Sequence, residues 1–179
     1  MHAPFRLFSL WLCRFGCGST FILEHGAYLL AQEPGQHPFA QQIITMQAKE
    51  AEALAAKAAG NADAAIAKMK EAVAIEDSID SLSQPPYPII PANELFGALL
   101  MELNRPADAK ERFLQTLKRT PGRPKAIYGI ARASQATGDK ATAHQCYQQF
   151  LTLWKNADPG RSEVTTAKEF LAKEPAAAE

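Results

Sequence analysis

The chain has 179 residues, which is enough for one domain with a buried core and too few for two full domains. Its 19 basic and 19 acidic side chains give a net charge of zero, so no overall charge favours nucleic acid or an anionic surface as a partner. Alanine is abundant from residue 48 onward and runs of β-branched residues are nearly absent, a composition that favours helices. We therefore expect an all-α protein.

Residues 1–38 differ from the rest of the chain and predict an N-terminal extension, disordered or signal-like. The apolar run from Leu7 to Cys13 is too short to span a membrane, which needs about 20 residues. Arg6, this run and the small residues after it are compatible with a weak secretory signal, although no clear cleavage site follows. The sequence favours a cytoplasmic location and leaves a periplasmic or a secreted one open. Residues 1–38 can alternatively be the remnant of a longer chain.

The remainder predicts a helical repeat domain over residues 39–173. Helix-forming segments alternate with turn residues, and a loop with four prolines between residues 85 and 91 separates the first pair of helices from the second. Gly138 ends one helix and Asp139 is placed to cap the next. The predicted elements are hairpins at 39–80, 91–119 and 124–156, a capping helix at 162–173 and a disordered tail at 174–179.

The turn residues Asn104 and Gly138 lie 34 positions apart, and other residues repeat at the same interval. At that interval a small residue in the first helix, an alanine in the second and an aromatic residue one turn later all recur. The repeated positions are Gly97 with Ala131, Ala109 with Ala143, and Phe113 with Tyr147. Small residues permit close helix crossings and the aromatic rings fill the space beside them, so we expect the hairpins to stack in series.

This pattern, with Pro121 near the end of its repeat, resembles tetratricopeptide (TPR) repeats, and the chain is similar to the C-terminal part of longer bacterial TPR proteins. The second hairpin matches the pattern best, the third has Lys155 in place of the proline, and the first is degenerate. The resemblance implies an α-α superhelix of about three hairpins with a C-terminal capping helix.

The resemblance also implies a non-enzymatic scaffold that binds a peptide or a partner helix on its concave face. The lysine–asparagine clamp of chaperone-binding TPR domains is not met, because Glu50 and Leu54 occupy those positions. The alternative is an exported, envelope-associated assembly factor or lipoprotein-like component, and homo-oligomerisation stays open. The predicted partner-binding residues are Glu94, Met101, Glu102, Lys125, Tyr128, Arg132 and Gln135.

The sequence predicts no catalytic residue, cofactor or metal site. Cys13, Cys17 and Cys146 are an odd set at uneven spacing, which is not a disulfide framework. His25 and His37 are too far apart for a zinc finger. Basic residues after the second hairpin are typical of helix C-termini, where they complement the dipole, so nucleic acid is not an expected partner.

Overall fold

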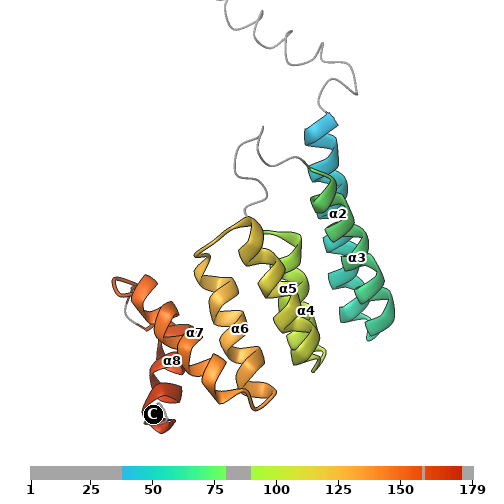
Figure 1. Ribbon diagram of the computed structural model, residues 1–179. Coiled ribbons are helices and arrows are strands. Elements are labelled where there is room, and N and C mark those ends of the chain that lie inside the picture. The colour runs from blue at the N-terminus through green and yellow to red at the C-terminus, as the bar shows by residue number, and fades with distance from the viewer. Residues whose placement is uncertain (1–37, 80–89, 159, 175–179) are drawn as a thin grey trace, which may run out of the picture. The chain divides into compact units, whose positions relative to one another are not determined.

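The computed structural model describes residues 38–79, 90–158 and 160–174, which apart from Pro38 belong to one unit, Phe39–Glu179. Every regular element within these residues is a helix, so the all-α prediction is confirmed (Figure 1). The predicted N-terminal extension up to residue 37 and the tail from 175 lie outside the described residues. The helices are α2 (Pro38–Ala58), α3 (Ala62–Ser78), α4 (Ala92–Glu102), α5 (Pro106–Arg119), α6 (Pro124–Ala136), α7 (Lys140–Leu153) and α8 (Ser162–Lys173).

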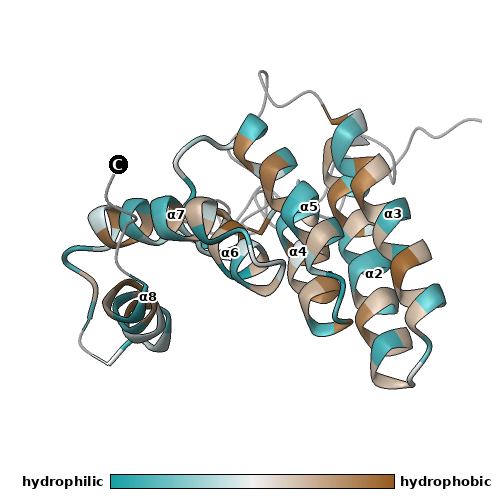
Figure 2. Cartoon of the chain, turned by 60° about the horizontal axis from the view of Figure 1, so that its bottom comes forward, coloured by the Kyte–Doolittle hydropathy of each residue, from teal (hydrophilic) through white to brown (hydrophobic). Residues whose placement is uncertain are grey.

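From α3 onward each helix packs against the next in the chain, and α4 also contacts α6. Such a serial arrangement lets each amphipathic helix bury its apolar face against its neighbours (Figure 2). Ala109 and Ala143 are fully buried, as are the rings of Tyr147 and Phe150. The alternation of small and large residues along the sequence therefore corresponds to side chains inside the core.

The ring of Phe113 on α5 packs against two glycines. A methyl group added at Gly97 on α4 would lie 2.7 Å from the ring, and one added at Gly129 on α6 would lie 2.5 Å from it. These distances are well inside van der Waals contact, so neither helix could approach α5 as closely with a larger residue. Phe113 thus sets how closely both α4 and α6 can approach α5.

The turns inside the three hairpins share one backbone geometry. Gly60, Asn104 and Gly138 all have positive φ, between 56° and 81°. In each turn the amide of this residue donates to the carbonyl three residues back, and the next amide donates to the carbonyl five residues back. This pair of bonds is the Schellman motif, which satisfies carbonyls left free at a helix C-terminus.

Asn104 is the only one of these three turn residues that carries a side chain, so Asn104→Gly should raise the free energy of unfolding by about 0.5–1 kcal/mol. The gain comes from the left-handed conformation, which costs glycine no steric energy. Chemical denaturation at equilibrium measures the change. Gly138→Ala is the opposite case and should lower stability, so two changes of the same sign would contradict the shared geometry.

Glu76 supplies the N-terminal cap of α4 from a different helix. Pro91, at the N-cap position of α4, offers no side-chain hydrogen bond, but the buried carboxylate of Glu76 accepts from the amide of Ala92 at 3.1 Å and from that of Asn93 at 3.3 Å. Arg119, at the end of α5, donates to the backbone carbonyls of Glu76 and Ile79. The C-terminal end of α3 is therefore bonded to both helices of the following hairpin.

Candidate functional site

The predicted partner-binding residues come from the first helices of the second and third hairpins. Lys125, Tyr128, Arg132 and Gln135 follow one another at intervals of three or four along α6, so they share one face of that helix. Met101 and Glu102 lie at the end of α4, which contacts α6. The sequence register and the helix contacts together bring these two groups onto neighbouring helices.

Some of these side chains are exposed to solvent, and others are partly buried or bonded to a neighbouring helix. Lys125, Arg132 and Gln135 are exposed, Met101 is partly buried against the core, and Glu102 is exposed and paired with Lys57 of α2. Neither Lys125 nor Arg132 forms an ion pair within the described part of the chain. We refer to Met101, Glu102, Lys125, Arg132 and Gln135 as the first-helix surface.

Glu94 is placed differently from its sequence assignment. It is only 5% exposed, and its carboxylate accepts from Nε and Nη2 of Arg123, with the Nη2 contact at 3.2 Å. Because the carboxylate is buried and both of its oxygens are bonded to Arg123, little of it is open to a second ligand. Glu94 therefore joins α4 to the start of α6 and is not part of the first-helix surface.

Tyr128 is partly buried in an aromatic cluster instead of standing free on the surface. Its ring centroid lies 5.9 Å from that of Tyr147 and 5.0 Å from that of Phe150, both on α7. Tyr147 in turn packs against Phe170 of α8 at 4.9 Å. Tyr128 thus helps to hold α6 against α7 in the third hairpin, and only part of its ring is exposed to solvent beside the first-helix surface.

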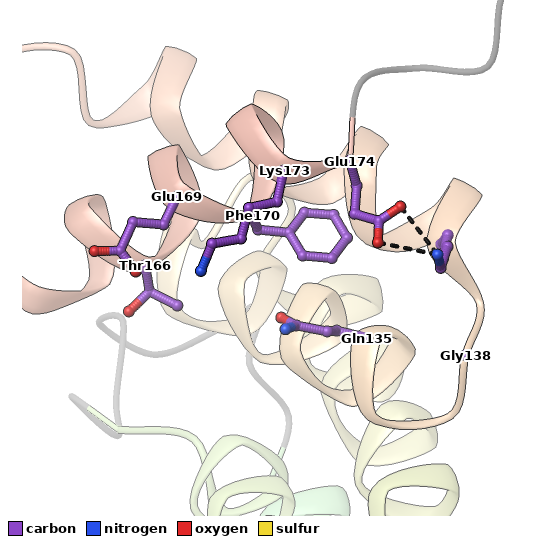
Figure 3. Close-up of a pocket in the computed structure, with 8 residues that line it drawn as sticks. Gln135, Gly138, Thr166, Glu169, Phe170, Lys173 and Glu174 are labelled. Atoms are coloured by element: carbon purple, nitrogen blue, oxygen red, sulfur yellow. Dashed lines mark hydrogen bonds and ion pairs between the residues drawn. The ribbon is translucent and has the colours of Figure 1, made fainter.

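Gln135 connects this surface to a hollow beside the capping helix. Its side-chain oxygen accepts the hydroxyl proton of Tyr147 at 2.8 Å, and burial raises the pKa of Tyr147 to about 12, so the phenol stays a donor. The hollow has a volume of about 310 Å³ and lies between the end of α6 and α8, with Phe170 on its wall (Figure 3). The ion pair between Lys140 and Glu174, with contacts of 2.9 and 3.0 Å, lies along its margin.

The start of α7, which borders this hollow, is held by a second polar contact. Asp139 accepts from the amide of Thr142 at 3.1 Å, as the sequence predicts for an N-cap, and Lys110 of α5 donates to its other oxygen at 2.8 Å. The bond from Lys110 is the main reason that the pKa of Asp139 falls to about 2. This carboxylate is therefore ionised and engaged throughout the neutral pH range.

No group of three or more acidic, histidine or cysteine side chains suited to a metal ion occurs among the described residues. Cys146 is partly buried, and burial raises the pKa of its thiol, so the reactive thiolate is disfavoured. No helix in the described ranges is long and apolar enough to cross a membrane. The first-helix surface instead carries charged side chains, the amide of Gln135 and the thioether of Met101. Such groups form non-covalent contacts with a partner.

No protein-family model matches the sequence, and the search of curated proteins found no match. Among solved structures, the Sgt2 TPR domain from Aspergillus fumigatus matches with a TM-score of 0.53 over 75% of this chain and 87% of that chain, at 19% sequence identity. The fold is TPR-like. The helical hairpins seen here are those of a TPR superhelical fold, and the predicted resemblance is confirmed at the level of architecture.

Sequence reasoning missed three residues that shape this TPR-like chain. Gly129 lies outside the 34-residue register yet meets the same ring as Gly97. Glu76 caps a helix that begins 16 residues later, across the proline-rich loop. Glu50 occupies a clamp position in the repeat register, but no sequence signal indicates that its carboxylate is partly buried near Glu76.

Proposed function

We propose that this TPR-like chain is a non-enzymatic protein-interaction module that binds a peptide or a partner helix on the first-helix surface. The observation that carries the proposal is the exposure of Lys125 and Arg132 on one face of α6, seven residues apart, with no ion pair to either within the described ranges. Exposed cations outside intramolecular pairs are free to engage carboxylates of a partner, and an arginine can do so with two parallel hydrogen bonds.

Apolar contacts that a bound segment needs are available beside the charges. Leu54 on α2, outside the first-helix surface as defined, is 43% exposed, and the partly buried Met101 contributes a flexible thioether. The pair between Lys57 and Glu102 bridges α2 to α4 on the same side. A segment with an acidic residue near one end and apolar residues along its length fits this order of groups.

A charge reversal tests the proposal. Lys125→Glu combined with Arg132→Glu should lower the amount of each partner captured from source lysate at least about tenfold, because like charges placed opposite each other across an interface cost several kcal/mol. Both side chains are exposed, so the variant should keep the helical circular dichroism spectrum of the wild type.

The matched control carries the same change in net charge on second helices. Lys70→Glu on α3 and Lys118→Glu on α5 reverse two exposed cations away from the first-helix surface. This control should capture the same partners in wild-type amounts. Equal capture by both double variants and the wild type would remove the first-helix surface as the binding site.

A further inference from the structure

Two carboxylates and an amide meet where α2, α3 and α4 join. Glu76 is 4% exposed, and both of its oxygens accept hydrogen bonds, Oε1 from the amide of Ala92 and Oε2 from the amide and side chain of Asn93. Glu50 of α2 lies near enough for the charge of Glu76 to act on its carboxyl group, and its Oε1 atom is buried with no donor among the described residues. Buried acceptors without donors are rare in folded proteins and require an explanation.

Both basic side chains of α2 are engaged elsewhere, and on α3 Lys68 pairs with Glu52 and Glu71 while Lys70 is exposed. Lys49, beside Glu50 on α2, pairs with Glu71 at 2.9 Å, and Lys57 of α2 pairs with Glu102. Arg119 of α5 is the cation that faces Glu76, but it donates to the backbone carbonyl of that residue and not to its carboxylate.

The acidic side chain next to Glu76 and the buried one on α4 are already bonded to arginines, so they donate nothing to the carboxylates of Glu50 and Glu76. Asp77, next to Glu76 on α3, pairs with Arg119, and Glu94 of α4 is held by Arg123. The side-chain oxygen of Asn93 is itself a buried acceptor without a donor in the described part of the chain. No cation bonds to either carboxylate in the described part of the chain, so two ionised carboxylates would repel each other, and partial burial strengthens that repulsion.

We propose that Glu50 and Glu76 form a proton-dependent latch, in which a proton on Glu50 holds α2 against α3 and α4 and its loss near neutral pH loosens α2. The geometry assigns the proton to Glu50 because both oxygens of Glu76 already accept hydrogen bonds. Oε1 of Glu50 accepts none, so protonation there sacrifices no existing bond.

The direction of the pH dependence follows from the environment of Glu50. Burial first, and the charge of Glu76 second, raise the pKa of Glu50 from 4.5 to about 7. A carboxyl group with a raised pKa in the folded state stabilises that state fully below its unfolded pKa, and this contribution is lost as pH rises through the folded pKa. Attachment of α2 should therefore weaken between about pH 4.5 and pH 7, in the window set by the two pKa values, and stay weak above it.

Hydrogen exchange of the full chain at pH 6 and pH 8 tests the latch. After division by the intrinsic exchange rate at each pH, protection of amides in the middle of α2 should fall about tenfold at pH 8, while that of α7 should stay constant. About one pH unit of this window, from pH 6 to the folded pKa of about 7, lies between the two measurements, and each such unit changes the equilibrium about tenfold. In Glu50→Gln, whose amide resembles the protonated acid, α2 protection should not depend on pH.

Glu111→Gln is the matched control, because Glu111 is an exposed glutamate of α5 and lies on a different hairpin. It should keep the wild-type pH dependence of α2. Carbon-13 NMR of the wild-type side-chain carboxyl groups gives a second readout that needs no folded variant, and the Glu50 resonance should titrate near neutral pH. A Glu50 midpoint below about pH 5, a parallel loss of protection in α2 and α7, or an unchanged pH dependence in Glu50→Gln would each overturn the latch.

Discussion

Phe113→Ala should lower the free energy of unfolding by about 3–5 kcal/mol, the range for removing a buried phenylalanine ring from a core. The ring is 4% exposed and lies against Gly97 of α4 and Gly129 of α6. Because glycines face the ring from two helices, neither of these positions has a side chain that can move into the cavity. Equilibrium urea unfolding followed by circular dichroism measures the loss, and a change under about 1 kcal/mol would show that the ring does not set this spacing.

A second substitution at Gly129 isolates the contact. Gly129→Ala alone should be destabilising, because the new methyl group would overlap the Phe113 ring and overpacking costs about 1–3 kcal/mol. In the Phe113→Ala background the same substitution should be stabilising by about 1 kcal/mol, since alanine is the better helix former and the ring is gone. The sign reversal between the two backgrounds is the result that a contact between these residues requires.

Phe170→Ala should release the capping helix α8 from the third hairpin at a cost of about 3–4 kcal/mol. Phe170 is 8% exposed, and its ring packs against Tyr147 at 4.9 Å. Ala167 is the other buried residue of α8, so few buried apolar side chains would remain to hold this helix. Repeat arrays lose terminal elements locally, so we expect amides of α8 to lose hydrogen-exchange protection while those of α4 and α5 keep theirs.

Leu171→Ala on the same helix is the matched control for α8. Leu171 is partly buried and packs against the same cluster without a ring contact. Its truncation should cost less than that of Phe170 and leave α8 protected. If the two variants behaved alike, the aromatic contact would not be what attaches the capping helix.

The hairpins could be predicted because their determinants are local or periodic. Helix-forming runs, turn residues and a 34-residue recurrence of Ala109 with Ala143 and of Phe113 with Tyr147 are all visible along one chain. These residues form the core because small and large side chains must alternate wherever helices cross closely. The three-hairpin architecture therefore follows from helix-forming runs, turn residues and their spacing along the sequence.

The polar contacts could not be predicted, because their partners are far apart in sequence. Glu94 looks like a groove residue until Arg123, 29 positions later, is brought onto its carboxylate. Glu76 and Asn93 are separated by 17 positions and the proline-rich loop. Repeat register assigns a residue to a helix face, but whether its charge is free or paired depends on side-chain conformations that no periodicity encodes. For the same reason the sequence does not identify the partner.

The three equivalent turns have a consequence for how such a chain can evolve. Asn104 and Gly138 stand 34 residues apart with the same pair of amide-to-carbonyl bonds around each. A gene duplication or deletion of that length between them would rejoin two halves of one turn and regenerate both bonds at the new junction. The number of hairpins can therefore change by whole units, because each new junction would have the same turn as the original ones.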